Sequence, residues 1–153
     1  MRYKTEVIIN LPRERVIELF DSFENLKKWQ EGLVSFEHIS GDPGRPGAKT
    51  RLLYDMGRRR MEMIETIIER DLPDEFSGTY DASGVHNIVR NYFYDEGEQT
   101  RWVLDSEFQF RSFMRIMSLF IPGSKFREQT RSSMEAFKRF AENAPTDIEP
   151  DND

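Results

Sequence analysis

The stretch from about residue 34 to residue 110 constrains the fold more than any other part of the chain. It divides into six segments in which apolar and polar residues alternate, separated by short turns rich in Gly, Pro and Asp. Alternation with a period of two is typical of a strand with one covered face, and short turns join neighbouring strands in antiparallel fashion. We therefore predict an antiparallel meander whose apolar face needs a cover.

The residues before the meander predict one further strand and two short helices. Residues 3–10 alternate as a strand, and Pro12 is suited to the first turn of a helix that runs to about residue 20. Apolar residues then recur every three or four positions from Phe23 to Leu33, which predicts a second short helix. The sheet would thus have seven strands.

The residues after the meander predict the cover. Residues 124–143 carry an apolar stripe at helical spacing and a charged opposite side, which indicates one long helix lying on the sheet. The fold class is therefore α+β. We expect residues 1–143 to form a single domain and residues 144–153 to be an acidic, disordered tail.

Composition narrows the classes of function. The chain has no cysteine, so disulfides and thiolate chemistry are excluded. Its net charge of -6 argues against nucleic acid as a partner. The N-terminus lacks the apolar run of a signal peptide, and no stretch is long enough for a membrane-spanning helix. The expectation is a soluble, cytoplasmic protein.

The order of these elements resembles the helix-grip fold of the START-related (SRPBCC, Bet v-like) superfamily, which includes polyketide cyclases and lipid-transfer proteins. VIINLPRERVIELFDSFENLKKWQEGL is similar to the opening strand and helices of that group, and ISGDPGRPGAKTRLLY is similar to its Gly-rich loop. The resemblance covers roughly residues 3–142. It implies a curled sheet gripping the long helix, with a cavity between them for a lipid, polyketide or other hydrophobic molecule.

Glu65 is the candidate for acid or base chemistry. In RMEMIETIIER, Met61, Met63 and Glu65 share one face, so an inward-facing Met pair would place a carboxyl group in mid-strand among apolar residues. Burial would raise the pKa of that carboxyl group, as a general acid or base requires. The opposite register puts Ile64 and Ile68 inside and Glu65 in water. Parity alone leaves both registers open, and the Met pair favours the first.

The same parity proposes a lining for an apolar chamber with a few polar points. Such a composition suits an amphipathic ligand whose polar end is fixed by two or three groups, although a filled core with a satisfied polar cluster would have the same pattern. The proposed ligand-binding residues are Leu52, Tyr54, Met61, Met63, Glu65, Asn87, Asn91, Trp102, Leu104, Ser106, Phe108, Met117, Phe120, Met134 and Phe137.

Three other motifs indicate little chemistry. GDPGRPGAKT lacks the Gly directly before Lys and the following helix that a phosphate-binding loop needs. His38 and His86 are not at metal-ligand spacing, so we expect no metal and no cofactor. Arg58-Arg59-Arg60 falls at a hairpin turn, either as a solvated tip or as a site for an acidic headgroup.

Residues 113–123, FMRIMSLFIPG, form the most apolar segment of the chain. A short helix that is apolar all round must be buried or meet another surface. Pro122-Gly123 provides a hinge, so the segment could close the cavity mouth. A homodimer contact and a transient membrane contact are the alternatives.

The sequence thus favours a protein that binds a hydrophobic or amphipathic small molecule and could also transport it. The first alternative is a cyclase- or dehydratase-like enzyme acting on a polyketide-type substrate, with Glu65 assisted by His86 or Tyr54. The second is a homodimerising interaction module.

Overall fold

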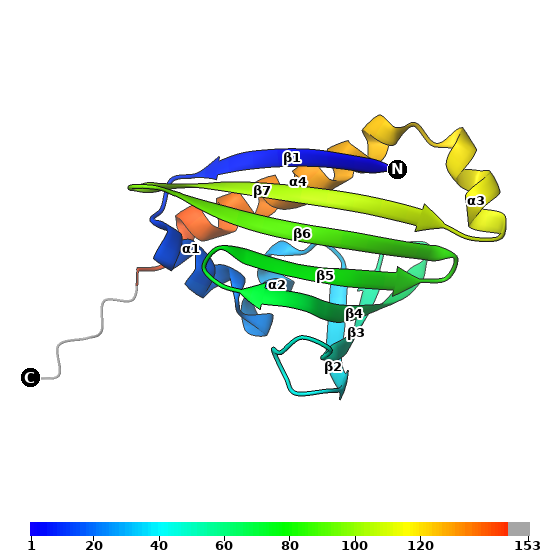
Figure 1. Cartoon of the computed structure of the whole chain (residues 1–153), viewed down its shortest axis with the longest axis horizontal. Helices are drawn as coiled ribbons and strands as arrows, with labels where there is room; N and C mark the ends of the chain where they lie inside the picture. The colour runs from blue at the N-terminus through cyan, green and yellow to red at the C-terminus, as the bar shows by residue number, and fades with distance from the viewer. Residues whose placement is uncertain (147–153) are drawn as a thin grey trace, which may run out of the picture.

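A seven-stranded antiparallel sheet wraps one face around a long helix in the computed structural model, in which residues 1–146 are described (Figure 1). The strand order is β1-β7-β6-β5-β4-β3-β2, so the first strand lies beside the last and the others follow the chain as hairpins. The elements are β1 (Arg2–Ile9), α1 (Arg13–Phe20), α2 (Phe23–Trp29), β2 (Leu33–Ser40), β3 (Lys49–Asp55), β4 (Arg60–Asp71), β5 (Glu75–Ala82), β6 (Val85–Glu96), β7 (Gln99–Phe110), α3 (Phe113–Met117), the 3₁₀ turn η1 (Ser118–Phe120) and α4 (Gly123–Asn143).

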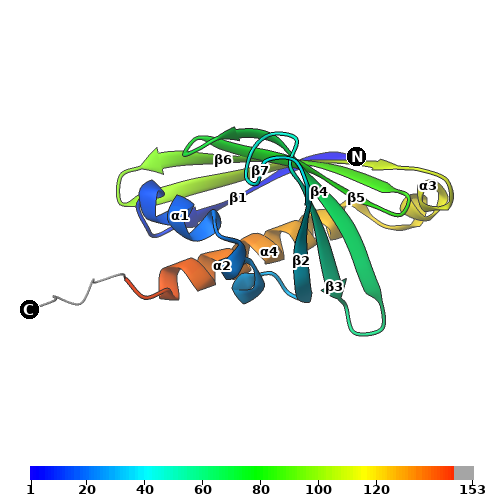
Figure 2. The same ribbon diagram turned by 90° about the horizontal axis from the view of Figure 1, so that it is seen from below.

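This arrangement confirms the predicted fold class. The prediction for the acidic tail concerns mainly residues 147–153, which lie outside the described residues. α4 runs along the inner face of the sheet, and α1 and α2 lie beside its C-terminal half (Figure 2).

Aromatic side chains fill the space between the sheet and the C-terminal half of α4. Phe137 of α4 is fully buried, and its ring meets Phe20, Trp29 and Trp102 edge-on at centroid distances of 5.1–5.7 Å. Phe93 stacks on Trp102 at 5.9 Å. Such offset and edge-to-face pairs add to the burial of large apolar surface, so this end of the grip is solid core.

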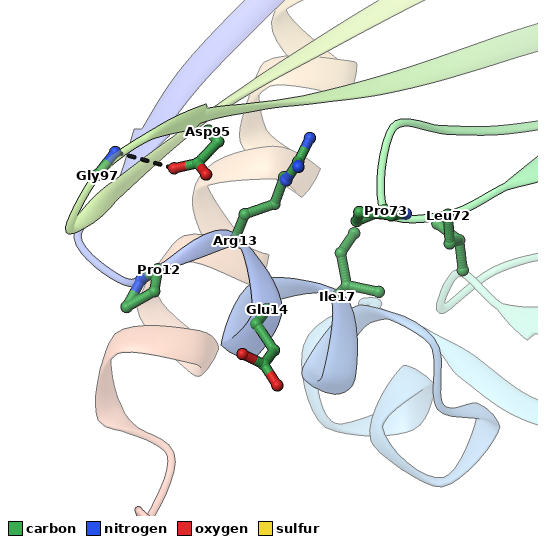
Figure 3. Close-up of a pocket in the computed structure, with 8 residues that line it drawn as sticks. All are labelled: Pro12, Arg13, Glu14, Ile17, Leu72, Pro73, Asp95 and Gly97. Carbon is green, nitrogen blue, oxygen red and sulfur yellow. Dashed lines mark hydrogen bonds between the residues drawn. The ribbon is translucent and has the colours of Figure 1, made fainter.

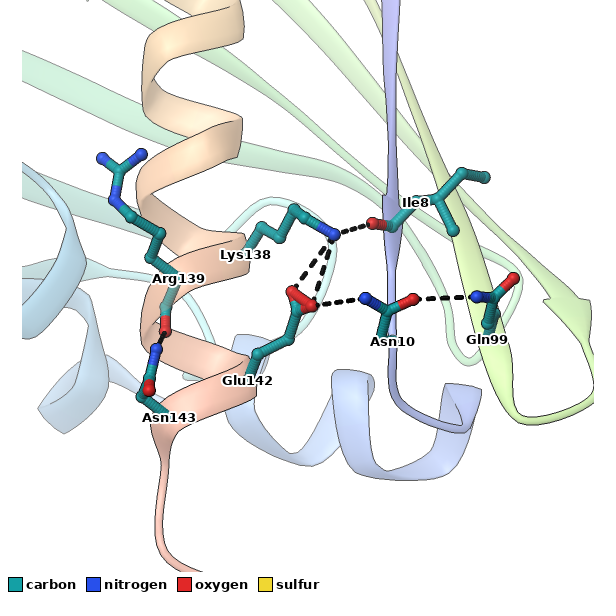
Figure 4. Close-up of polar contacts among 7 residues, drawn as sticks. All are labelled: Ile8, Asn10, Gln99, Lys138, Arg139, Glu142 and Asn143. Carbon is teal, nitrogen blue, oxygen red and sulfur yellow. Dashed lines mark hydrogen bonds and ion pairs between the residues drawn. The ribbon is translucent and has the colours of Figure 1, made fainter.

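Polar contacts fix the same half of α4 to β1, as Figure 4 shows. The Lys138 Nζ donates to the backbone carbonyl of Ile8 and pairs with Glu142 at 3.1 Å. Glu142 also accepts from the Asn10 side chain at 2.8 Å, and Asn10 in turn accepts from Gln99 at 2.8 Å. The C-terminal half of α4 is therefore held by both apolar and polar contacts.

The predicted apolar helix at 113–123 is present as α3 followed by η1, at the opposite end of the molecule (Figure 1). Met114 contacts Gly84 in the β5–β6 turn, where an added Cβ would lie 2.7 Å from the Met114 Cγ. Phe113, Ile116, Leu119 and Phe120 are exposed. Among residues 1–146, no helix has both the length and the apolar character needed to cross a bilayer.

Candidate functional site

Glu65 is buried in the middle of β4, which confirms the inward register. Its exposed fraction is 8%, whereas Ile68 on the other face is 47% exposed. Its cross-strand partners are Thr50 on β3 and Tyr80 on β5. Gly78 lies one strand away from Ile67, and a Cβ there would be 4.0 Å from the Glu65 Cγ, so the glycine leaves room for the carboxylate side chain.

The surroundings of Glu65 favour its neutral form. Burial raises the pKa of the Glu65 carboxyl group, and a hydrogen bond from Tyr80 opposes that shift without a cation to assist it. No Lys, Arg or His among the described residues forms an ion pair with this carboxyl group. A protonated carboxyl group both donates and accepts hydrogen bonds, which is what a neutral polar ligand needs.

Two tyrosine hydroxyls accompany Glu65. Tyr80 is its direct neighbour, and burial together with the nearby carboxyl group raises the pKa of Tyr80 well above its ordinary value. Burial likewise raises the pKa of Tyr54, with a smaller contribution from Glu65. The Tyr54 hydroxyl donates to the Gln30 side chain just after α2, which ties that helix to β3.

The remaining polar points on this face have protein partners. Ser106 donates to the Asn87 carbonyl oxygen at 2.9 Å. Asn91 accepts from the Trp102 indole at 3.0 Å and donates to the Phe76 carbonyl at 3.1 Å. Asn91 and Ser106 are therefore structural in this state, as buried polar groups usually are.

Trp29 has an unused donor. Its indole Nε1 is buried and has no hydrogen-bond partner among the described residues. Its ring packs on Phe20 and Phe137 at the edge of the aromatic core, and the next residue, Gln30, is the partner of Tyr54. An orphaned N–H is costly unless something accepts from it, so Trp29 belongs to the candidate site.

A pocket of about 230 Å³ opens beside the Glu65 row. Thr50, the cross-strand partner of Glu65, and Ile67, two residues further along β4, form part of its wall. The other lining residues come from α2, β2 and the Gly-rich loop: Phe23, Phe36, His38, Pro43 and Gly44. The loop that the sequence identified is thus one rim of this pocket.

A second, larger pocket of about 490 Å³ is an open groove between α1 and the β4–β5 and β6–β7 turns (Figure 3). Its cation, Arg13, is already paired with Asp74 at 2.7 Å and donates to the Phe93 carbonyl. Asp95 accepts from the Gly97 backbone at 2.9 Å. Because its charged groups are engaged with the protein, we regard the pocket beside Glu65 as the better candidate.

The proposed lining residues separate into three groups. Leu52, Tyr54, Met63, Glu65 and Asn87 lie on the inner face of the sheet near the smaller pocket, with Met61 38% exposed at the strand end. Trp102, Leu104, Met134 and Phe137 belong to the packed core, and Phe108 stacks with Tyr3 and Phe126. Met117 and Phe120 face solvent, so their contact with a ligand stays a prediction that requires the α3 end to move.

The structure corrects the pairing of His86 with Glu65. His86 precedes Asn87 on β6 and so points to the opposite face, where it contacts Asp81. His38 is exposed at the mouth of the smaller pocket. Among residues 1–146, no three His, Asp or Glu side chains gather into a metal-binding group.

Tyr80, Gln30 and Trp29 are site residues that the sequence analysis missed. Parity on β5 would have placed Tyr80 on the face of Phe76 and Gly78, but that segment was not divided into faces. No local signal shows that Gln30 reaches Tyr54 or that the Trp29 N–H lacks a partner, because both depend on how α2 packs.

The sheet, its gripping helix and the site define an α+β protein of the helix-grip class. The family model for polyketide cyclase / dehydrase and lipid transport matches residues 1–142, and the chain belongs to that family. The START-related resemblance is thereby confirmed, and the family is associated with binding hydrophobic small molecules.

Solved structures share the fold at low identity. The Zhui aromatase/cyclase from Streptomyces sp. R1128 has a TM-score of 0.75 at 14% identity, covering 93% of each chain. TTHA0849 from Thermus thermophilus has a TM-score of 0.72 at 18% identity, covering 92% of this chain and 97% of that one. A START superfamily protein from Mycobacterium smegmatis has a TM-score of 0.69 at 13% identity, covering 92% and 94%. No curated protein sequence matches the chain.

Proposed function

We propose that this protein binds a hydrophobic or amphipathic small molecule between the sheet and α2, with the polar group of the ligand against Glu65. The observation that carries the proposal is a carboxyl group, 8% exposed, without a cationic partner among the described residues. A buried carboxyl group of this kind is costly to the fold, and such groups concentrate at functional sites. The orphaned Trp29 N–H adds a second donor that a ligand oxygen would satisfy.

The size of the pocket limits the ligand. A volume of about 230 Å³ lies below the roughly 300–1,000 Å³ typical of drug-sized sites. It holds a small molecule, or one end of a longer one. Phe23, Phe36 and Ile67 suit an apolar group, while Thr50 leads toward the carboxyl row.

The electrostatics favour a neutral polar group over an anionic one. A ketone or hydroxyl oxygen would accept from the protonated Glu65, whereas a carboxylate ligand would meet no cation there and would disfavour any ionised Glu65. We therefore propose ketones, alcohols or polyketide-like carbonyl compounds as the ligand class, rather than free fatty acids.

Calorimetry with a medium-chain methyl ketone and the fatty acid of the same length tests this. We expect the ketone to bind more tightly. Glu65→Leu should weaken the ketone by about 5–10-fold, since one hydrogen bond is lost. Glu65→Gln keeps a neutral donor and acceptor and should retain the binding. Glu69→Gln, an exposed change on the same strand, serves as the control. Preference for the fatty acid, or equal ketone binding by Glu65→Leu, would contradict the proposal.

A second candidate function is catalysis on a polyketide-type substrate. It is supported by the raised pKa of Glu65 together with the nearby Tyr54 and Tyr80 hydroxyls, since a protonated buried carboxyl group can act as general acid toward a substrate oxygen. Glu65→Gln separates the two functions because it should abolish turnover while ligand binding survives. Unchanged turnover would remove Glu65 from an acid–base role.

Gating of the pocket by residues 113–123 remains part of the proposal. Pro122 precedes the first turn of α4 and Gly123 begins that helix, so the chain can bend between the two segments. In the present conformation the apolar side chains of the segment point to solvent. Closure would therefore require α3 and η1 to swing toward the sheet. Cross-linking a cysteine placed at Phe120 to one at Met61, with and without the ketone, measures that motion.

A further inference from the structure

The α3–η1 segment, residues 113–121, presents the most apolar surface of the described chain. Leu119 is 81% exposed and Phe120 is 77% exposed, and Phe113 and Ile116 are also more than half exposed. These side chains lie on consecutive turns at one end of the molecule, beyond the edge of the sheet (Figures 1 and 2). Large adjoining apolar side chains left in water mark an interaction surface.

The charge around this segment is opposite to that of the rest of the chain. Residues 108–127 contain no Asp or Glu but include four exposed cations, Arg111, Arg115, Lys125 and Arg127. The chain carries -6 in total, so the remaining residues carry -10. Among the described residues, none of the four forms an ion pair; Arg127 lies over the Tyr3 ring at 5.9 Å. The cations are therefore free to meet an anionic partner.

The β3–β4 turn lies at the same end of the sheet. It carries the exposed run Arg58-Arg59-Arg60 and, beside it, Met56 at 51% exposure (Figure 2). Both the turn and the α3–η1 segment thus combine arginines with exposed apolar side chains. The opposite end of the molecule, which holds α1 and the C-terminal half of α4, has the packed core described above.

We propose that this end of the protein docks on an anionic lipid bilayer. Leu119, Phe120 and their neighbours would enter the boundary between headgroups and acyl chains, while the surrounding cations meet lipid phosphates. A net charge of -6 would otherwise repel the protein from such a surface, so the local concentration of cations is what permits the approach. The surface is shallow and does not need a spanning helix.

A second copy of the chain fits this surface less well. A symmetric dimer brings the same patch of both subunits together, so it would place four cations of one copy against the same four of the other. The proposal also goes beyond ligand binding, because docking depends on residues outside the pocket beside Glu65. Failure of one proposal leaves the other standing.

Vesicle flotation and tryptophan fluorescence test the docking. Phe120→Trp should show a blue-shifted emission with vesicles of phosphatidylcholine and phosphatidylglycerol, and much less with phosphatidylcholine alone. Leu119→Glu/Phe120→Glu should abolish flotation, because charges cannot enter the boundary. Val34→Glu, at an exposed apolar position on β2, is the matched control and should float as the wild type does.

The electrostatic part has its own pair of variants. Arg115→Gln/Lys125→Gln should weaken binding to the anionic vesicles by on the order of 25-fold, from about fivefold per cation near the surface. Lys28→Gln/Arg139→Gln removes the same charge from exposed positions elsewhere and should change binding little. Circular dichroism establishes that each variant is folded.

Two results would overturn the proposal. One is wild-type protein that fails to float with anionic vesicles at low salt. The other is concentration-dependent association in sedimentation velocity that Leu119→Glu/Phe120→Glu abolishes, which would assign the surface to a second copy instead.

Discussion

Glu65 on β4 and Tyr80 on β5 are direct cross-strand partners, and the tyrosine hydroxyl donates a hydrogen bond to the buried carboxyl group. Tyr80 also packs against the aromatic core. The carboxyl group is therefore held at the border between the solid half of the grip and the half that contains the smaller pocket. That border is where a ligand would meet both an apolar wall and a polar anchor.

The raised pKa of Glu65 predicts a pH dependence of stability. The folded state holds the Glu65 proton more tightly than the unfolded state, whose carboxyl group titrates near 4.5. Stability should therefore fall as the pH rises above about 4.5, until the folded-state pKa is passed. Urea denaturation from pH 4 to pH 8 should show that Glu65→Gln gains on the wild type over this range. Glu69→Gln should follow the wild-type curve, and parallel curves for all three proteins would contradict the shift.

The two tryptophans predict opposite costs for the same substitution. Trp102→Phe removes the donor to Asn91 and leaves a buried amide oxygen unsatisfied, which should add about 1–3 kcal/mol to the loss of packing. Trp29→Phe removes an N–H that has no protein partner, so only packing is lost. Chemical denaturation should therefore show the larger loss for Trp102→Phe. The reverse ranking would mean that the Trp29 donor is already satisfied, which would also weaken its case as a ligand contact.

The contact between Gly84 and Met114 can be separated from backbone strain. Gly84 and Gly97 have φ values of 74° and 79°, so alanine at either position should cost about 1–2 kcal/mol. Only at Gly84 would the new Cβ meet a side chain, Met114; around Gly97 nothing lies within 4 Å. Gly84→Ala should destabilise more than Gly97→Ala in thermal melts. The excess should disappear when Met114→Ala is added, and its persistence would exclude the contact as the cause.

Phe137 predicts the cost of opening the core. It is fully buried and contacts several other rings, so Phe137→Ala should reduce the free energy of unfolding by about 3–5 kcal/mol. Ile68→Ala, at a position 47% exposed, should change it by less than about 0.5 kcal/mol. Comparable losses in guanidinium titrations would mean that the core is looser than its contacts indicate.

The architecture could be predicted because strand alternation and turn residues are local signals. Residues 3–10 and 34–110 carry them strongly enough to order all seven strands. The register of β4 depended on Met61 and Met63 alone, and Glu65 confirms it, although Met61 itself ends 38% exposed where the strand leaves the covered face.

The site was less predictable, because it depends on distant packing. Tyr54 was identified, but its partner Gln30 follows a helix whose docking angle no short-range pattern specifies. The apolar character of residues 113–121 was plain in the sequence, yet what covers them was not. Leu119 and Phe120 turn out to have no cover within the described chain, and this exposure, rather than the composition, suggested a lipid surface.

The pairing of β1 with β7 has a consequence for synthesis. Arg2 faces Glu107, and the Met1 amino group reaches the Phe108 carbonyl, so the first strand made finds its partner only after about a hundred further residues have been added. The hairpins β2 to β6 can pair as they emerge, because their contacts are local. A nascent chain would carry its opening strand unpaired until β7 leaves the ribosome, and only then could the sheet close around α4.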